Sequence, residues 1–549
     1  MSTALNAGLS GLLAYQRAIN VHSQNIANVN TEGYVRQQVE FTQRGIPGRN
    51  GATEAGGVSI ARVRREVNDF LFDQGRQSLS AAARADELAT KAAQLSQLLG
   101  SADYGLDDTL RSLRNAIESL STEPTSLLAR EQLFVRLQLT VERFVAMDAR
   151  ISSYRDEVNA RLEAEVSRTN SFIRQIAGYN AEIAQQSLGG REASGTLLDA
   201  RDRALDELSR KATLEINRQS NGMVNVATRQ GLLLVNGSAA TELAIAADSF
   251  DPTANRIVVK GGSAGNDVDR QLTGGVLGGL IDIRNQLLSP AQNELGRIVA
   301  SLAIALNEIN AGGDDLSGSP GGAIFSLGQP LVRAAGGNTG TASLQAEFAT
   351  VAGLTGSDYL IERTASGWSI KRLQDGIEIT PSGAGTSTNP FVFDGLKLVV
   401  DNGGSGPAAG DRFLLQPTRN VVESLALAIE NGTQFAAALD GAGVGDNRNA
   451  RAMVEFFDQP WLRNGQQSIT DAAARLNMRL RSSLEAAELT RDVQQQSANE
   501  SLTERQDRYG VNLDQEAAEL MRFQQAYQAS AQVIRIANEL FDTLLNAAR

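Results

Sequence analysis

Residues 511–549 read VNLDQEAAELMRFQQAYQASAQVIRIANELFDTLLNAAR, and this stretch decides the fold. No proline or glycine interrupts it, and Asn512 or Asp514 can cap the start of a helix. A large side chain recurs at every seventh position: Leu513, Leu520, Tyr527, Ile534 and Phe541. The positions four further on carry Ala517, Gln524, Ala531, Asn538 and Leu545. This seven-residue period predicts an amphipathic helix with a coiled-coil-like seam.

The opening of the chain has the same period. Residues 4–34 read ALNAGLSGLLAYQRAINVHSQNIANVNTEGY. The stripe consists of Leu5, Leu12, Ile19 and Ile26, with Leu9, Gln16 and Ser23 four places after the first three. Asparagine and glycine tolerate turn geometry, so we expect the helix to end at residues 28–33 and an extended stretch to follow through Phe41. His22 lies between stripe positions and is interpreted as an exposed or interface polar residue.

The two terminal helices share a seven-residue period, so they are expected to pair. The chain would then run out from the first helix and back to the second. Neither seam is purely apolar, and four or five heptads form only a marginal coiled coil. The polar seam positions are typical of helices that complete their packing against other subunits. A helical hairpin packed within one chain accounts for the same pattern, and periodicity leaves both interpretations open.

Between the ends, the pattern changes from helix to strand and back. Apolar spacing predicts helices at about 70–100, 107–124, 126–188 and 276–310, with Pro290 bending or splitting the last. Short alternation with Asn-Gly turns predicts β structure at 211–275, and Gly, Ser and Thr-rich sequence predicts an all-β insert at 320–420. Helices are expected again at 421–440, at 446–458 and from 467.

The fold class that follows is mainly α with β insertions, in an elongated rod whose terminal helices pair and whose outer β domain is inserted centrally. The predicted domains are a terminal helical domain (1–60 and 500–549), a helical body (61–210, 276–319 and 421–499), a small β subdomain (211–275) and an outer β domain (320–420).

Composition removes several classes of function. The net charge of −12 without a basic block argues against binding to nucleic acid. Cysteine is absent and His22 is the only histidine, so we expect no thiolate chemistry, no metal site and no cofactor. No apolar stretch approaches the roughly 20 residues of a membrane span, so no membrane insertion is expected. The start also lacks the features of a cleaved signal peptide, which leaves a cytosolic location or an export route that reads no such signal.

Three enzyme-like features carry little weight. The glycines at 441–445 follow helical sequence rather than a strand, which is wrong for a dinucleotide loop. Asp314 and Asp315 lack the order of a calcium-binding loop and are interpreted as a turn. Any acidic chain offers carboxylate pairs for glycan cleavage, so a cell-wall hydrolase is the alternative of a different class, and lytic activity on purified cell wall would identify it.

The terminal motifs resemble a known family. Residues 4–14 and 25–34 are similar to the N-terminal signature of flagellar axial proteins, which comprise the rod, hook and hook-associated proteins. Residues 511–516 and 523–531 resemble the matching C-terminal signature. Inside the chain, LLDARDRALDEL at 197–208 and GDNRNA at 445–450 resemble motifs of the hook-associated members. The hook protein, which shares the ends but not these motifs, is the runner-up. Glu32 departs from the proline common in the family, and 320–420 matches only loosely.

The resemblance implies a non-enzymatic, structural part of the bacterial flagellum at the junction of hook and filament. It implies packing with copies of itself in a tube, contact with the hook protein and the second hook-associated protein, export without cleavage through the flagellar type III apparatus to the cell exterior, and a C-terminal export chaperone. The terminal domain is expected to be disordered in the free monomer. Assembly residues are expected at Leu5, Leu9, Leu12, Ile19, Ile26, Leu513, Leu520, Tyr527, Ile534 and Phe541. The chaperone is expected to bind Leu520, Tyr527, Ile534 and Phe541.

Overall fold

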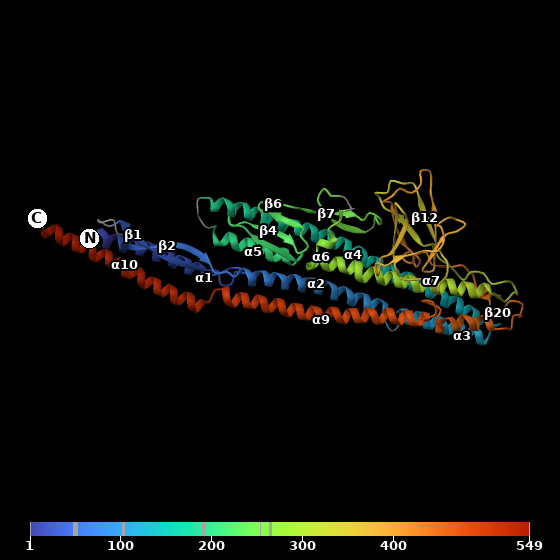
Figure 1. Ribbon diagram of the computed structural model, residues 1–549. Coiled ribbons are helices and arrows are strands. Elements are labelled where there is room, and N and C mark those ends of the chain that lie inside the picture. The colour runs from blue at the N-terminus through green and yellow to red at the C-terminus, as the bar shows by residue number, and fades with distance from the viewer. Residues whose placement is uncertain are drawn as a thin grey trace.

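The computed structural model describes residues 2–47, 53–101, 105–188, 193–252, 254–262 and 266–547. The molecule is a long rod with both termini at one end and a β domain standing off its side (Figure 1). Helices make up 53% of the chain and strands 18%, which confirms the predicted mainly α fold with β insertions. The paired terminal helices, α1 (Ser2–Ala27) and α10 (Leu513–Ala547), confirm that part of the prediction as well.

Long helices form the body of the rod. They are α2 (Asp69–Leu99), α3 (Leu106–Thr122), α4 (Leu127–Ser187), α5 (Gly195–Ser209), α6 (Gly275–Asp282), α7 (Ser289–Ala311), α8 (Arg448–Asp458) and α9 (Ile469–Tyr509). Side-chain caps start several of them: the Ser126 hydroxyl accepts from the Ala129 N–H, and Ser468 forms a capping box with Asp471. Pro290 lies in the first turn of α7, directly after a π-helical turn, so the predicted split there is confirmed.

The apolar stripe of α4 is the spine of the core. Its buried members recur at helical spacing: Leu133, Leu137, Phe144, Ile151, Val158, Leu162, Val166, Ile173, Ile176 and Ile183. On the other side of the body α2 packs along α9, and α9 follows the lower edge of the rod in Figure 1. The buried apolar side chains of α2, α4 and α9 belong to one continuous core, which extends into both β regions.

A β-hairpin joins the terminal helices to the body. Its strands are β1 (Gln37–Pro47) and β2 (Thr53–Arg65), paired antiparallel with Gln37 opposite Arg65. The extended stretch expected through Phe41 is therefore longer than predicted, and its partner strand was missed. At the other end of the chain, α9 and α10 are separated at Gly510. The predicted domain boundary at residue 60 lies within β2 and the one at residue 500 within α9, and the domain ranges stay predictions.

The small β region packs on α4. It contains β3 (Leu214–Arg218), β4 (Val224–Thr228), β5 (Leu233–Asn236) and β6 (Ala239–Ala240) in one sheet, and β7 (Leu243–Ala247) and β8 (Asn255–Val259) in another. Both predicted Asn-Gly turns are present. The two glycines, Gly222 and Gly237, have positive φ, at 83° and 56°, which explains why glycine occupies these positions.

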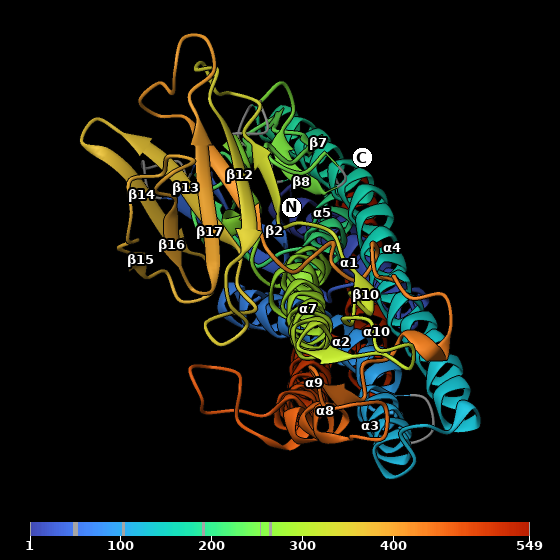
Figure 2. The same ribbon diagram turned by 90° about the vertical axis from the view of Figure 1, so that its right-hand side faces the viewer.

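The outer β domain contains two antiparallel sheets, which stand to one side of the helices in Figure 2. The first is β11 (Leu331–Ala334), β18 (Arg412–Gln416), β13 (Tyr359–Thr364), β14 (Gly367–Arg372) and β15 (Glu378–Ile379), in that order. The second is β12 (Ser343–Phe348), β17 (Leu396–Asp401) and β16 (Phe391–Phe393). Inward residues such as Tyr359, Phe413 and Leu398 are buried and join the main core.

The helix predicted at 421–440 is wrong. The structure has turns there, with β19 (Ala426–Leu427) paired to β10 (Phe325–Ser326) and β20 (Ala438–Leu439) paired to β9 (Gly313–Asp314). The buried guanidinium of Arg130 donates to the Phe435 carbonyl at 2.7 Å. A Cβ at Gly432 would lie 2.4 Å from the Arg130 carbonyl oxygen. Tertiary hydrogen bonds and close backbone packing override the local helical pattern. Helices at 446–458 and from 467 are confirmed by α8 and α9.

Candidate assembly interface

Glycines on α1 let the two terminal helices approach closely. A Cβ at Gly8 would lie 2.8 Å from Ile534 Cγ1, and one at Gly11 would lie 2.9 Å from Ser530 Oγ. A larger residue at either position would push α10 away. The small side chains therefore fix the spacing of the pair, while Ile534 and Ser530 fill the space that they leave.

An aromatic cluster joins the pair to the hairpin. Phe523 of α10 lies 5.6 Å from the Phe41 ring on β1 and 6.2 Å from the Tyr15 ring on α1, measured between centroids. Ala18 and Val21 of α1 are buried against the same phenylalanine. Stacked and tilted ring contacts of this kind add to the burial of apolar area, so three separate segments share one small core.

A buried carboxylate completes the junction. Glu516, at the start of α10, is fully buried. His22 Nδ1 lies 2.6 Å from Glu516 Oε2, which also accepts from the Asn25 side-chain amide at 2.9 Å. Arg36 Nε donates to Glu516 Oε1 at 2.7 Å. We call His22, Asn25, Arg36 and Glu516 the Glu516 cluster. It ties the end of α1, the entry to the hairpin and the start of α10 to one side chain.

The environment of the Glu516 cluster keeps the carboxylate ionised. Burial alone would raise the pKa of Glu516, but hydrogen bonds from His22, Asn25 and Arg36 outweigh burial and hold the pKa below its ordinary value. Asn25 also accepts from the Tyr34 hydroxyl at 2.8 Å. Burial, together with the charges of Asp199 and Glu516, raises the pKa of Tyr34 to about 12, so this hydroxyl remains a donor.

The structure brings some of the predicted interface residues together. Leu520, Tyr527 and Ile534 are half-buried on α10, as are Leu12, Ile19 and Ile26 on α1. Leu5, Leu9, Leu513 and Phe541 are exposed in the single chain. The other half of the predicted α10 seam is not covered within the single chain, and its packing against other subunits stays a prediction: Ala517, Gln524 and Asn538 are exposed, Ala531 is half-buried, and the side chain of Leu545 lies outside the described residues. The better-covered second register lies three places after the first, with Glu516, Phe523 and Ala537 buried and Ser530 half-buried.

The shift has a physical reason. A heptad stripe can be completed by the residues three places on or by those four places on. The set four places on is the more apolar, because it includes Ala517, Ala531 and Leu545. The set three places on includes Glu516, and a carboxylate is not expected at a buried position without partners. Its donors come from the far end of the chain, so no local pattern could reveal them. The sequence left His22 either exposed or at an interface, and the structure buries it against Glu516 of α10.

The motif at 197–208 performs a second joining role. Asp199, Asp202 and Asp206 lie on one side of α5, and we call them the α5 aspartate cluster. Arg65, at the end of β2, lies 2.8 Å from Asp199 and 2.7 Å from Asp202. Asp206 forms ion pairs with Arg76 of α2 at 2.7 Å and with Arg505 of α9 at 2.8 Å. Three aspartates on one helix thus hold arginines from three other elements.

The two neighbouring aspartates respond to burial in opposite ways. Burial raises the pKa of Asp202, but Arg76 and Arg65 outweigh it and lower the pKa to about 2. For Asp199, burial is the largest effect and raises the pKa. Arg65 lowers the pKa only in part, and repulsion from Asp202 raises it further, to about 6. Asp202 therefore stabilises the fold as an anion, whereas the charge on Asp199 is unfavourable.

We expect Asp202→Asn to lower the free energy of unfolding at pH 7 by about 3 kcal/mol, because it leaves two buried guanidiniums undercompensated. Asp199→Asn is the matched control and should leave stability unchanged or raise it. Urea unfolding of the full chain measures both, and equal losses would contradict the assignment. The pKa of Asp202 is lowered on folding, so its contribution is present above pH 3.8 and is lost toward pH 2. The pKa of Asp199 is raised, so acidification from pH 6 to 3.8 acts in the stabilising direction at this residue.

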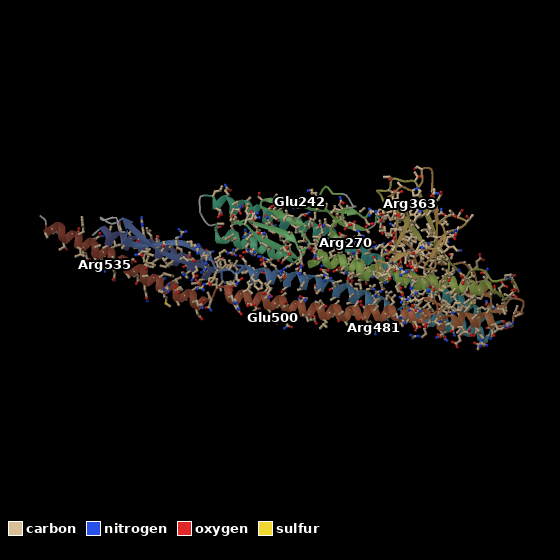
Figure 3. All side chains as sticks on the ribbon, viewed as in Figure 1. Glu242, Arg270, Arg363, Arg481, Glu500 and Arg535 are labelled. Carbon is tan, nitrogen blue, oxygen red and sulfur yellow. The ribbon has the colours of Figure 1, made fainter. Side chains whose placement is uncertain are left out.

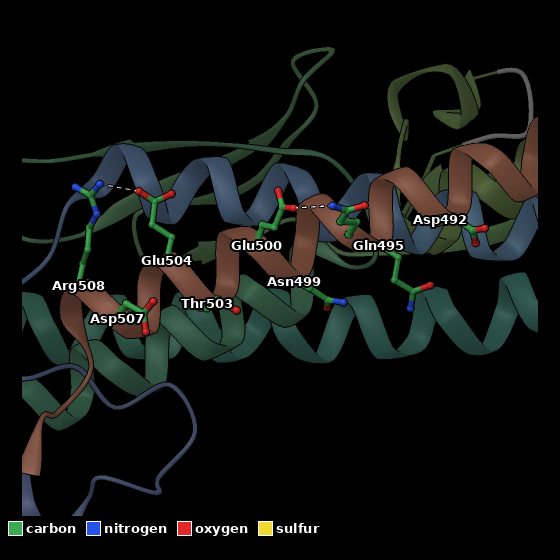
Figure 4. Close-up of a pocket in the computed structure, with 9 residues that line it drawn as sticks. Asp492, Gln495, Asn499, Glu500, Thr503, Glu504, Asp507 and Arg508 are labelled. Carbon is green, nitrogen blue, oxygen red and sulfur yellow. Dashed lines mark hydrogen bonds and ion pairs between the residues drawn. The ribbon is translucent and has the colours of Figure 1, made fainter.

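Other polar features cap turns or face solvent. Asp315 accepts from the backbone N–H groups of Ser317 and Ser319, and Asp314 accepts from that of Gly441. A shallow groove on α9 is lined by that helix alone, with Glu504 paired to Arg508 at 2.9 Å (Figure 4). Among the described residues, no group of three or more His, Asp and Glu side chains is placed to hold a metal ion. Within the described residues, no helix is both long enough and apolar enough to cross a membrane.

Comparison with known families identifies the class of the chain. Residues 5–34 match the flagella basal body rod protein family, and residues 507–547 match the C-terminal family of flagellar basal body rod FlgEFG proteins. Residues 92–325 match the helical domain of flagellar hook-associated protein FlgK, and residues 334–417 match a D2-like domain of flagellar hook-associated protein 1. Both ends and both middle regions thus define a structural protein of the flagellar axis.

Full-length relatives narrow this class. Flagellar hook-associated protein 1 of Salmonella typhimurium is 31% identical over 560 residues, and that of Escherichia coli is 30% identical over 556, each covering 100% of both chains. The flagellar hook junction protein FlgK of Burkholderia pseudomallei has a similar solved structure, with a TM-score of 0.71 and 25% identity over 79% of this chain and 99% of that one. The chain belongs to the flagellar hook-associated protein 1 family.

Proposed function

We propose that the chain is a structural adaptor, without turnover, between the flagellar hook and the filament. The observation that carries this is the terminal unit: α1 and α10 pair closely, yet leave apolar side chains uncovered. Leu13, Met521, Ile536 and Leu540 are each more than half exposed. An apolar surface of this kind requires a partner, and copies of the chain packed in a tube would supply it, with hook protein below and the second hook-associated protein above.

Deleting the gene should leave hooks without attached filaments and release flagellin into the medium, because no surface remains on which the filament can grow. Electron microscopy of the cells and assay of the culture fluid measure the two effects. A plasmid copy should restore both. Loss of the hook itself would favour the runner-up, a hook protein, and normal filaments would overturn the adaptor. A cell-wall hydrolase would instead show lytic activity on purified cell wall.

The same proposal includes a route to the tip. The chain would leave through the flagellar type III apparatus unfolded and uncleaved, with both ends mobile until they meet neighbouring copies. While the ends are mobile, the apolar stripe of α10 lacks its cover by α1 and would aggregate in the cytoplasm, so we assign Leu520, Tyr527, Ile534 and Phe541 to an export chaperone. Because the same face packs on α1, chaperone release would precede assembly.

A further inference from the structure

A cavity of about 510 Å³ lies where the helical body meets the outer β domain. Its walls come from α7, from the start of α9, from the loop at 463–467, and from loops of the outer β domain around residues 353–357 and 372–375. Five arginines line it, against only the three carboxylates of Glu294, Asp375 and Asp394. In a chain with a net charge of −12, this local excess of positive charge is unusual.

The innermost arginine is incompletely paired. Arg297 of α7 is 1% exposed. Its Nε and Nη2 donate to the Glu294 carboxylate at 3.0 and 2.5 Å, and Nη2 lies 3.4 Å from Gln467 Oε1. Its Nη1 has no hydrogen-bond partner among the described residues. Leaving a buried charged donor unsatisfied is costly, so an acceptor is missing from this wall.

Three more guanidiniums are unpaired around the cavity. Arg463, Arg475 and Arg479 form no ion pair or side-chain hydrogen bond with any residue in the described parts of the chain. Arg475 and Arg479 are one helical turn apart, where like charges repel. Arg463 has a φ of 51°, an uncommon backbone conformation for a side chain of this size. The backbone N–H of Asn464, bonded to the Ala352 carbonyl at 2.7 Å, holds this loop against the outer domain.

We propose that this cavity binds a small multivalent oxyanion of the phosphate type. Guanidinium forks match the geometry of phosphate oxygens, and an anion would relieve the repulsion between Arg475 and Arg479. It would also give Arg297 its missing acceptor. Four of the arginines come from α7, α9 and the 463–467 loop, and the fifth, Arg372, ends β14 of the outer β domain, so the bound anion fastens that domain to the rod.

Titration calorimetry of inorganic phosphate into the purified full-length chain tests the site, in chloride buffer of constant ionic strength. Saturable binding at one site is expected. The double substitution Arg475→Gln and Arg479→Gln should weaken it at least tenfold. Both side chains are exposed, so the fold should survive. Arg481→Gln is the matched control, because Arg481 is an exposed arginine of the same helix that does not line the cavity (Figure 3).

Absence of saturable binding to the wild-type chain overturns the proposal. So does equal affinity in the double variant, which would indicate an adventitious ion only. A second readout is limited proteolysis at the junction of body and outer domain: phosphate should slow cleavage in the wild-type and Arg481→Gln chains but not in the double variant. Arg297→Lys keeps the charge but loses the fork, and should weaken phosphate binding; its melting temperature measured without phosphate should fall as well, because the two buried bonds to Glu294 are lost.

Discussion

Glu516→Ala is expected to separate the start of α10 from α1 and the hairpin, with a loss of about 4 kcal/mol in the free energy of their association. The reason is that His22, Asn25 and Arg36 lose the acceptor that they share, while all of them stay in or near the buried junction. Cells carrying the variant should make hooks but attach few filaments. Glu539→Ala, the same change at an exposed position of α10, should behave as wild type.

Amide exchange separates the loss of the Glu516 cluster from general unfolding. In assembled junctions, residues 18–27 and 513–523 should exchange faster in Glu516→Ala than in wild type, whereas the body helix α4 should not change. Unchanged exchange at both segments would contradict the role of the cluster. In the free chain, both segments should exchange fast even in wild type, because the ends are proposed to order only on assembly. Strong protection there would overturn that part of the proposal.

Acid should loosen the same junction. The pKa of Glu516 is lower in the folded state than its ordinary value of 4.5, so the unfolded state binds the proton more readily. The stabilisation by Glu516 is therefore fully present above pH 4.5 and is lost as the pH falls through the folded pKa. Filament detachment below pH 4.5 measures this, and Glu516→Gln should remove the acid-dependent step at Glu516.

Replacing both Tyr527 and Ile534 with Asp should abolish incorporation at the hook tip and weaken chaperone binding. Ile534 packs against Gly8, and burying a carboxylate at either position costs several kcal/mol, of the order of 3 for each site. Gln524→Asp with Asn538→Asp is the matched control, because it adds the same charge to the exposed side of α10. Both functions should survive in the control.

Two assays distinguish the two partners of this face. A peptide of residues 505–549 is titrated against the cognate chaperone, and filament attachment is scored in cells. No binding of the wild-type peptide at micromolar concentration rejects the chaperone proposal alone. Normal filament attachment in the Asp variants rejects the pairing of α10 with α1 as an assembly requirement. Loss of both in the variants, with neither lost in the control, supports competition for one face.

Periodicity was sufficient to predict the terminal helices, and turn chemistry predicted the break after residue 27 and the two Asn-Gly hairpins of the small β region, but not the β1–β2 hairpin. The apolar stripe of α4 was also predicted, since its burial follows from local spacing. The pattern could not predict hydrogen bonds and ion pairs between residues far apart in the sequence. Glu516 looks like a surface residue because its donors lie almost the whole chain away. The stretch 421–440 looks helical until Arg130 and Gly432 are seen to hold it in turns. The motif at 197–208 was recognised only by resemblance, because its arginines come from β2, α2 and α9.

The α5 aspartate cluster has a mechanical consequence. A force pulling the hairpin away from the body acts on Arg65, and a force pulling on α9 acts on Arg505, and both end on the same short helix. Arg76 of α2 pairs with both Asp202 and Asp206. A load on the hairpin or on α9 is therefore shared with α2 before the ion pair of Arg65 or that of Arg505 breaks. Parallel bonds that must fail together resist shear better than bonds that fail in sequence. Stress arriving along the rod would therefore spread over β2, α2, α5 and α9 instead of separating one strand.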